Sequence, residues 1–250
     1  MSLSVIIISK NESRHIGPCL DSVAFADEII VLDCGSTDDT CTIARAKGAK
    51  VTQTTDWPGF GPQKNRALDL ATQEWVLSID ADERVTPELQ QAICVELQNP
   101  RAQAYKIARL SNFCGRWIRH SGWWPDHMLR LFKRGSARFS DAVVHESVQS
   151  EHSAVTLGGH FLHYPYADME SLIAKVNRYS TDAAVMMHAK RVKVSVLGAA
   201  GHAVWTFIRI YLLRRGFLDG KEGFILAATG AAGNFFRYSK LWLLNKRDKP

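Results

Sequence analysis

The chain of 250 residues has few of the features that stabilise small secreted or zinc-binding proteins. Its five cysteines are scattered along the sequence and form no Cys-x-x-Cys pair. An odd number of scattered cysteines argues against a zinc site or a disulfide framework and is typical of a reducing compartment. Internal repeats and low-complexity tracts are also missing, so the length predicts one large domain or a domain with an appendage.

Signals for common nucleotide folds and for membrane insertion are scarce too. The sequence contains neither Gly-x-Gly-x-x-Gly nor Gly-x-x-x-x-Gly-Lys-Ser/Thr, which removes the main support for a dinucleotide-binding or P-loop protein. No stretch reaches the ~18–20 consecutive apolar residues that cross a bilayer, and the apolar run at residues 5–8 is too short for a signal peptide. We therefore expect a cytosolic protein.

Positive charge is concentrated at one end of the chain. The net charge is +6, but residues 186–250 hold twelve Lys and Arg against three Asp and Glu. Residues 1–185 hold nineteen basic and twenty-two acidic residues, so the whole positive excess lies in the C-terminal part. Such a division predicts that this part meets an anionic partner.

The first eighty residues alternate between apolar runs and helix signals. Strands are predicted at residues 3–8, 28–32, from 51 onward and 75–79. Helices are predicted at residues 13–24, from a cap at Thr37 or Asp38 to 47–48, and at 63–72, with residues 59–62 as a loop. Strand and helix in this order predict an α/β fold with a parallel sheet.

The second half of the chain follows a different pattern. Thr86 and Pro87 begin a helix, and strands are predicted at residues 105–109, 128–133, 143–148 and 154–157 without long helices between them. This part of the sheet is therefore expected to be mixed or antiparallel, and a helical region begins near residue 167. We predict a catalytic domain of residues 1–166 and a helical region of residues 167–250.

Two aspartates stand two residues apart at the end of a predicted strand. Residues 75–79 are apolar at four of five positions, and Asp80 and Asp82 follow them. Ligands of open parallel sheets bind at the carboxyl ends of strands, where these acids lie. The pair suits a hard divalent cation that is shared with substrate phosphates. The alternative is a surface turn rich in acids.

Two further polar segments follow the same logic. Asp33 ends a predicted strand ahead of a glycine turn, where a carboxylate can accept hydrogen bonds from a nucleobase or ribose, or can merely build the turn. Lys64 and Arg66 lie at a predicted helix N-terminus, which favours anions such as a diphosphate. A solvated basic face is the alternative for these two.

Taken in order, these segments resemble glycosyltransferase family 2, the inverting enzymes with the GT-A fold. The matching residues are 5–12 (VIIISKNE), 33–38 (DCGSTD), 63–68 (QKNRAL) and 78–83 (SIDADE). A narrower branch, the lipopolysaccharide inner-core β-1,4-glucosyltransferases of Gram-negative bacteria, is resembled by residues 57–65, 129–134, 144–146 and 216–220. The resemblance implies a Rossmann-like, largely parallel sheet with a mixed second half, followed by an α-helical region.

The resemblance also implies a site for a nucleotide sugar. Its residues would be Ser9, Asn11, Glu12, Asp33, Lys64, Asp80 and Asp82. Asp33 would face the uracil and Asp80 the ribose. Asp82 would ligate a divalent metal, Mg²⁺ or Mn²⁺, that neutralises charge on the departing diphosphate. His160 and His163 could reach this metal or be structural.

An inverting transfer also needs a base that takes the proton of the acceptor hydroxyl. The family often supplies the base from a Glu-Asp pair, and this sequence has His145 and Glu146 in that place. We predict Glu146 as the base, with Asp126 in the loop of residues 123–126 as the alternative. The tryptophans of that loop could stack on an acceptor sugar or cap the core.

The C-terminal region has the composition of helices that lie at a membrane surface. Residues 194–208 and 223–236 are apolar runs that are flanked by basic and aromatic residues. We expect peripheral attachment to an anionic membrane, on the cytoplasmic face of the inner membrane. Ordinary core helices or a dimer interface are the alternatives.

The resemblance implies transfer of glucose from UDP-glucose to a heptose of the lipopolysaccharide core or to another membrane-anchored glycan. Three alternatives remain open. The first is transfer of the sugar to a polyprenyl phosphate. The second is nucleic-acid binding by the basic tail, although the sequence has no recognisable RNA or DNA motif. The third is a non-catalytic protein that binds nucleotide sugars.

Overall fold

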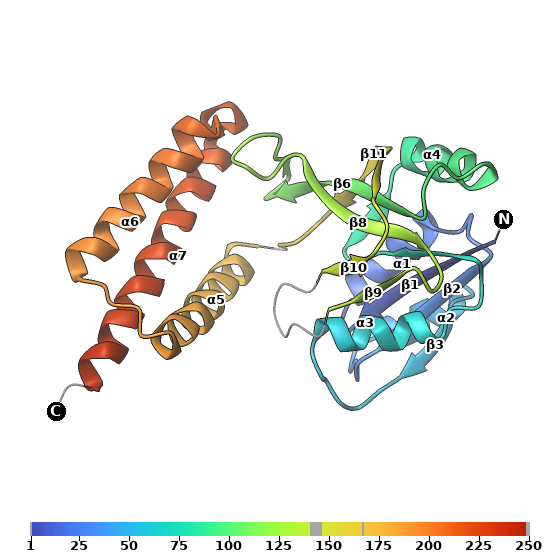
Figure 1. Ribbon diagram of the computed structural model, residues 1–250, viewed down its shortest axis with the longest axis horizontal. Coiled ribbons are helices and arrows are strands. Elements are labelled where there is room, and N and C mark those ends of the chain that lie inside the picture. The colour runs from blue at the N-terminus through green and yellow to red at the C-terminus, as the bar shows by residue number, and fades with distance from the viewer. Residues whose placement is uncertain (1, 141–146, 167, 249–250) are drawn as a thin grey trace. The chain divides into compact units, whose positions relative to one another are not determined.

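The computed structural model describes residues 2–140, 147–166 and 168–248. The chain forms two compact units. The first unit comprises Met1–Leu110 and Asp126–His163, and the second comprises Ser111–Pro125 and Tyr164–Pro250. Residues 111–125 therefore pack with the helical region, although they come from the middle of the sequence. Figure 1 shows the elements of both units.

The first unit is built on a mixed sheet with the strand order β3-β2-β1-β4-β8-β6-β11-β5. Its strands are β1 (Leu3–Ser9), β2 (Glu28–Asp33), β3 (Lys50–Gln53), β4 (Trp75–Ser78), β5 (Glu83–Val85), β6 (Ala104–Phe113), β8 (Asp126–Lys133) and β11 (Val155–His163). The first four run parallel to one another, whereas β8 is antiparallel to both β4 and β6. The predicted change from a parallel to a mixed sheet is confirmed. A separate antiparallel pair consists of β9 (Ala137–Phe139) and β10 (Val148–Ser150).

The sheet has an apolar core on each of its faces. Along β1, Val5 and Ile7 belong to the core cluster on one face, and Ile6 belongs to the cluster on the other. Helices α1 (Ser13–Ser22) and α4 (Pro87–Gln98) contribute to the first cluster, and α3 (Phe60–Asp69) contributes to the second. Burial on both faces explains why the parallel strands are nearly continuous apolar runs in the sequence.

Two predicted boundaries in the first unit were wrong. Residues 59–62 were expected to form a loop, but α3 begins at Phe60, directly after Gly59 with its φ of 116°. Pro62 is tolerated because the first amide groups of a helix have no partner within the helix. Helix α2 (Thr40–Ala46) is preceded by Asp39, which makes no side-chain cap, although the predicted capping residue Asp38 accepts a hydrogen bond from the Thr40 amide at 3.0 Å.

Other local predictions hold. Thr86 caps α4 by accepting a hydrogen bond from the Leu89 amide, and Pro87 is the first residue of that helix.

Gly159 on β11 has a φ of +76°, and a Cβ there would lie 2.5 Å from the Leu89 backbone. This glycine therefore lets α4 pack closely against β11.

The second unit is helical. Helices α5 (Met169–Ala189) and α6 (Val196–Ile208) both pack against α7 (Gly220–Arg247). A π-helix, η1 (Arg209–Leu213), and a 3-10 helix, η2 (Gly216–Asp219), connect α6 to α7. The short strand β7 (Arg116–Trp117) pairs with the end of β6. Phe113, Ile118, Leu172 and Leu226 form the buried core of this unit.

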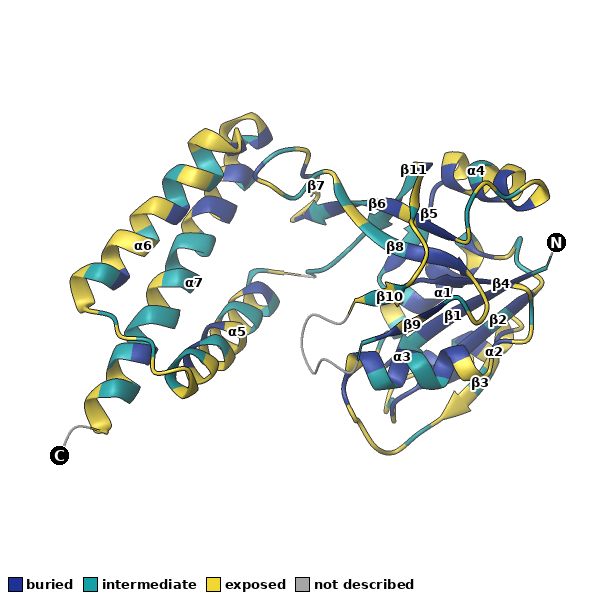
Figure 2. Cartoon of the chain, viewed as in Figure 1, coloured by how far each residue is buried: buried dark blue, intermediate teal, exposed yellow. Residues whose placement is uncertain are grey.

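One stretch of the second unit corrects an expectation from the sequence. Within the described residues, Val196–Leu213 is a helical segment of 18 residues that is long and apolar enough to cross a membrane, as judged by length and composition. The apolar run in the sequence ends at Arg209, but the helix continues past this arginine. Only 11% of the segment is buried, and much of α6 is exposed in Figure 2.

Candidate active site

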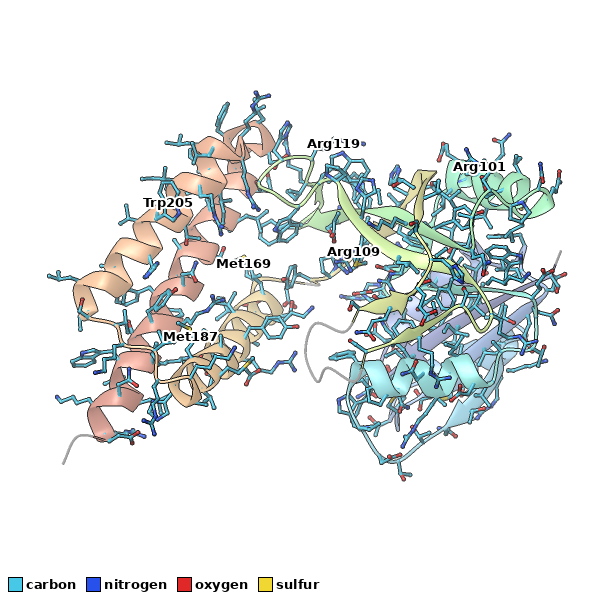
Figure 3. All side chains as sticks on the ribbon, in the orientation of Figure 1. Arg101, Arg109, Arg119, Met169, Met187 and Trp205 are labelled. Atoms are coloured by element: carbon cyan, nitrogen blue, oxygen red, sulfur yellow. The ribbon has the colours of Figure 1, made fainter. Side chains whose placement is uncertain are left out.

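A chain of alternating charges joins the ends of several strands of the first unit. We call it the charge network, and its members are, in order, Lys64, Asp80, Arg130, Glu83, Arg109 and Asp126. Each neighbouring pair lies within 2.7–3.3 Å. The network connects α3, the turn after β4, the start of β5 and the strands β6 and β8. Figure 3 labels Arg109, which lies on β6.

Asp80 is held by two cations. The Lys64 Nζ lies 2.8 Å from one carboxylate oxygen, and the Arg130 Nη2 lies 2.7 Å from the other. Burial acts to raise the pKa of Asp80, but the charges of Arg130 and Lys64 hold it well below its usual range. Asp80 is therefore ionised at neutral pH, and both of its oxygens are committed to protein partners.

Glu83 is the fully buried centre of the charge network. Its side chain is 0% exposed, and one oxygen accepts hydrogen bonds from Arg109 at 3.3 Å and Arg130 at 3.1 Å. The other oxygen accepts a hydrogen bond from the Asp80 amide at 3.0 Å. Glu83 thus fixes the turn that carries both aspartates and pairs with two guanidinium groups, which Asp80 and Asp126 also contact.

Asp82 has a different environment from Asp80. Its Oδ2 lies 3.4 Å from the Nε2 of His163, the last residue of β11. His163 comes to this position because it pairs with Glu83 in the antiparallel register of β11 and β5. A carboxylate beside an imidazole is a donor pair that first-row divalent metals accept.

A metal held here would need ligands from elsewhere. Among the residues that the structure describes, no group of three or more His, Cys, Asp and Glu side chains could hold a metal by itself. Mg²⁺ and similar ions are, however, commonly bound through one or two carboxylates together with substrate phosphates. Asp82 fits that second arrangement, which depends on a bound diphosphate, and His163 adds an imidazole beside it.

Asp33 forms a closed turn at the end of β2. Its carboxylate accepts hydrogen bonds from the amides of Gly35 and Ser36 and from the hydroxyls of Ser9 and Ser36. Burial acts to raise the pKa of Asp33, but the hydrogen bonds from Ser36 and Ser9 lower it below its usual value. A carboxylate has about four acceptor positions, so these donors already occupy the group.

The loops after β1 and β2 are joined through Asn11. This residue has a φ of 55°, which asparagine adopts more readily than most residues. Its amide donates a hydrogen bond to the Ser36 hydroxyl, and its side-chain oxygen accepts one from the Thr37 amide, both at 2.8 Å. Glu12 precedes α1, and its amide donates a hydrogen bond to Thr40. The structure thus brings Ser9, Asn11, Glu12 and Asp33 together at one end of the parallel strands.

Of the two residues predicted as candidates for the base, the structure describes Asp126 but not Glu146. Asp126 is half-exposed, and its Oδ2 accepts hydrogen bonds from Arg109 at 2.8 and 3.1 Å. This contact makes Asp126 the outer end of the charge network. Glu146 and His145 lie outside the residues that the structure describes, so the prediction of Glu146 as the base stays a prediction.

Three members of the network, Glu83, Arg109 and Arg130, were given no role from the sequence. Arg130 lies inside a predicted strand between Leu129 and Leu131, and its side chain is almost fully buried. Charged residues are rarely buried without a partner. An arginine within an otherwise apolar strand was therefore the available signal, although its partners could not be identified from it.

Comparisons with known proteins agree with this architecture. The sequence profile of Glycosyl transferase family 2 matches residues 4–153, more than half of the chain. The lipopolysaccharide core biosynthesis glycosyltransferase LpsC of Rhizobium meliloti is 30% identical over 258 residues, an alignment that covers 97% of this chain and 92% of LpsC. An uncharacterised glycosyltransferase of Rickettsia typhi is 32% identical over 260 residues, covering 99% of this chain and 89% of that protein.

A solved structure supports the fold. The crystal structure of S. aureus TarS 1–349 aligns with 100% of this chain and 92% of its own, with a TM-score of 0.50 and 15% identity. This likeness concerns the GT-A fold alone. The matches to the profile and to LpsC confirm the resemblance seen in the sequence motifs. This chain belongs to glycosyl transferase family 2 and is a glycosyltransferase.

Proposed function

We propose that the chain transfers a hexose, glucose in the simplest case, from a uridine diphosphate sugar to a sugar of the lipopolysaccharide core. The observation that carries this proposal is that Asp80 and Asp82, which both follow β4, have different partners. Lys64 and Arg130 occupy the two oxygens of Asp80, whereas the ion pair found for Asp82 within the described residues is with the His163 imidazole. We therefore assign Asp82 to the metal ion, which would in turn be shared with the diphosphate.

Asp82 and His163 would hold the divalent cation, Mg²⁺ or Mn²⁺. When bound, this ion neutralises negative charge on the departing nucleoside diphosphate. The protein itself would contribute the cationic groups of Lys64 and Arg130, whose positions are fixed by ion pairs with Asp80 and Glu83. Fixed charges stabilise a transition state better than mobile ones, because they need no reorganisation when the bond breaks.

The loops held by Asp33 and Asn11 form the nucleoside side of the proposed site. Since the Asp33 carboxylate is filled by Ser9, Gly35 and Ser36, we assign it the role of shaping the turn that meets the base. A direct contact between Asp33 and the uracil requires one of these donors to turn away. The effect of Asp33 on binding is then exerted through the positions of Ser36 and Asn11.

The transfer itself is a displacement at the anomeric carbon with inversion. The acceptor hydroxyl oxygen forms the new bond to carbon, the bond to the diphosphate oxygen breaks, and the hydroxyl proton passes to a carboxylate. Glu146 remains our candidate for that carboxylate. Asp126 is the less suited of the two, since Arg109 already donates two hydrogen bonds to it.

The proposed acceptor comes from the relationship to LpsC, whose name states lipopolysaccharide core biosynthesis. That alignment extends through both units, including the helical unit. Core sugars are carried on a lipid, so we place the protein on the cytoplasmic face of the inner membrane. Transfer to a polyprenyl phosphate is the rival, and it also places the acceptor in a membrane.

Calorimetric titration of UDP into the purified chain, with and without Mn²⁺ or Mg²⁺, tests the donor site. We expect tight binding only with metal, and at least tenfold weaker binding by Asp82→Asn, which corresponds to about 1.4 kcal/mol. The control is Asp69→Asn, because Asp69 forms an exposed pair with Arg138 elsewhere in this unit. Metal-dependent binding that is equally tight in Asp82→Asn would contradict the assignment.

The acceptor is tested separately. UDP-glucose and other UDP-hexoses are incubated with the enzyme and either a truncated lipopolysaccharide core or a polyprenyl phosphate, and the products are identified by mass spectrometry. Product on the core alone supports the proposal. Product on the lipid phosphate alone overturns the proposed acceptor and leaves the donor site intact.

A further inference from the structure

The connection between α6 and α7 carries a concentrated apolar surface. We call residues 209–225 the apolar turn. Its large exposed apolar side chains are Leu212, Leu213, Phe217, Leu218, Phe224 and Ile225. Leu213 is 63% exposed, and Phe217 and Phe224 are exposed by about half. Side chains of this kind that are scattered singly are common on protein surfaces, but a contiguous group marks an interaction site.

The aromatic rings of this surface support one another. The Tyr211 ring lies 6.3 Å from that of Phe217 and 5.6 Å from that of Phe224, both edge to face. Phe207 lies 5.6 Å from Phe224 in the same geometry. Contacts of this kind hold the rings in place. The exposed apolar surface is therefore preformed rather than a set of loose side chains.

The same surface continues along the outer side of α6. Leu197, Val204, Trp205 and Leu212 are more than half exposed, and Figure 3 labels Trp205. Their spacing of seven or eight residues places them on one side of a helix. The opposite side, which includes the buried Ala199 and Thr206, packs against α7. We call these four exposed residues, three on α6 and Leu212 on η1, the outer stripe of α6.

Basic residues border the apolar turn. Arg209, Arg214, Arg215 and Lys221 are exposed. The two acidic residues of the apolar turn, Asp219 and Glu222, already bind other residues of the second unit. Asp219 is buried and accepts hydrogen bonds from the amides of residues 119 and 120 and from a serine hydroxyl, and Glu222 pairs with Arg116. The exposed charge around the rings is thus positive.

We propose that the apolar turn and the outer stripe of α6 bind the surface of an anionic phospholipid bilayer. The helix lies in the plane of the membrane, its apolar side chains enter the boundary between headgroups and acyl chains, and the bordering arginines and Lys221 meet lipid phosphates. This inference gives the membrane location proposed above a defined surface. It rests on the second unit alone and is independent of the donor and acceptor.

The charges of α7 favour binding in the plane of the membrane over crossing it. α7 packs along α6 and carries Lys221, Arg237 and Lys240. The Lys240 Nζ bonds to Asn177 and Ser180 of α5, so this ammonium is fixed within the helical unit. A hairpin of α6 and α7 across the hydrocarbon core would draw Arg237 and Lys240, which lie well inside α7, toward the hydrocarbon, and this is costly.

The chemistry of the surface also separates lipid from other partners. Nucleic-acid sites present a polar basic face with base-stacking rings, whereas here aliphatic and aromatic side chains outnumber the charges that border them. A second copy of the chain would bring the same positive border against itself, which is unfavourable. An anionic bilayer matches both the apolar surface and its positive border.

Flotation of the full chain with vesicles tests the proposal. We expect flotation with mixed phosphatidylcholine and phosphatidylglycerol vesicles, and little with phosphatidylcholine alone. The double variant Phe217→Ser/Phe224→Ser is expected to lower the partition coefficient at least tenfold. Arg209→Gln/Lys221→Gln is expected to lower it by about 30-fold, since each basic residue near an anionic surface contributes about a factor of five.

Matched controls lie in the first unit. Val95→Ser replaces an apolar side chain on α4 that is 61% exposed, and Arg45→Gln/Lys106→Gln removes two exposed charges. Neither is expected to change the partition coefficient. Circular dichroism melting curves establish that every variant is folded, so that a loss of flotation reports on the surface.

Several outcomes would overturn the proposal. Wild-type-like flotation of the two phenylalanine substitutions would show that the apolar turn is not the contact. Resistance of the bound protein to high salt and alkaline carbonate would indicate a helix that crosses the bilayer. A dimer in solution that Phe217→Ser/Phe224→Ser converts to a monomer, with no flotation of either, would assign the surface to a second copy of the chain.

Discussion

The two units of the chain differ in how many charged residues they bury and how many large apolar side chains they expose. In the first unit the buried residues include six charged ones: Glu28, Asp33, Lys64, Glu83, Glu96 and Arg130. In the second unit Asp219 is the one buried charged residue among those the structure describes. Large exposed apolar side chains show the reverse distribution, with five in the first unit and seventeen in the smaller second unit, counted over the described residues.

This contrast agrees with the partner that we propose for each unit. A site for a phosphorylated sugar needs charges at fixed positions, and fixing them requires partners that are themselves buried. A surface that meets lipid needs apolar side chains on the outside and helices that satisfy their own backbone hydrogen bonds. The first unit therefore combines its two apolar cores with buried long-range ion pairs, whereas the second relies on the packing of helices.

The largest effect is expected from Glu83→Gln, which removes the centre of the charge network. The substitution leaves the buried Arg130 and the partly exposed Arg109 without their shared carboxylate. Removing one partner of a buried pair costs about 3–5 kcal/mol, so the free energy of unfolding should fall by that amount. Urea unfolding followed by circular dichroism measures the change.

The matched control is Glu74→Gln in the same unit. Glu74 forms an exposed pair with Lys133 at 3.5 Å. Exposed pairs contribute about 0–1 kcal/mol, so little change is expected. Equal effects of the two substitutions would show that the first unit does not depend on its buried charges and would remove the contrast between the units.

A smaller effect is expected on acidification. Burial acts to raise the pKa of Glu28, but hydrogen bonds from Lys50, Ser4 and Thr72 lower it from 4.5 to about 2. Because the carboxylate is more acidic in the folded chain, its contribution is complete above pH 4.5 and is lost as the pH falls toward 2. The difference corresponds to about 3 kcal/mol of unfolding free energy.

Glu28→Gln should therefore flatten the dependence of stability on pH in that window. Unfolding free energies measured between about pH 5 and pH 3 give the slope for the wild type and the variant. Glu151→Gln, which changes an exposed acid of the same unit, should leave the slope as it is. A wild-type slope in Glu28→Gln would mean that other acids govern acid unfolding.

The parallel half of the first unit was largely predictable from the sequence. The strands β1, β2 and β4 begin at Leu3, Glu28 and Trp75, where the sequence placed them. Each is a continuous apolar run that ends in polar turn residues, and this pattern arises because both faces of a parallel strand are buried. The same pattern placed Asp33, Asp80 and Asp82 at strand ends.

The partners of these acids were not predictable, because they depend on strand order. Arg130 lies 50 residues from Asp80 along the chain, and Arg109 lies 26 residues from Glu83. Only the antiparallel insertion of β8 and β6 beyond β4 brings the arginines to the acids. The packing of residues 111–125 with the helices was hidden for the same reason, since no local pattern reports a contact with Asp219.

The smallest expected effects concern two glycines of the helical unit, and they test whether close helix packing stabilises this unit. A Cβ at Gly223 on α7 would lie 1.9 Å from the Gly216 carbonyl oxygen, so Gly223→Ala forces the backbone of the connection apart. Overpacking of this kind costs about 1–3 kcal/mol.

At Gly201 on α6, nothing lies within 4 Å of the position that a Cβ would occupy, and alanine favours a helix over glycine by about 0.5–1 kcal/mol. Gly201→Ala should therefore stabilise the chain and Gly223→Ala destabilise it, as measured by thermal unfolding. The two substitutions add the same methyl group to neighbouring helices. Opposite signs would locate the stability of the helical unit in the close approach of α7 to its connection, whereas two stabilising substitutions would show that helix propensity alone governs it.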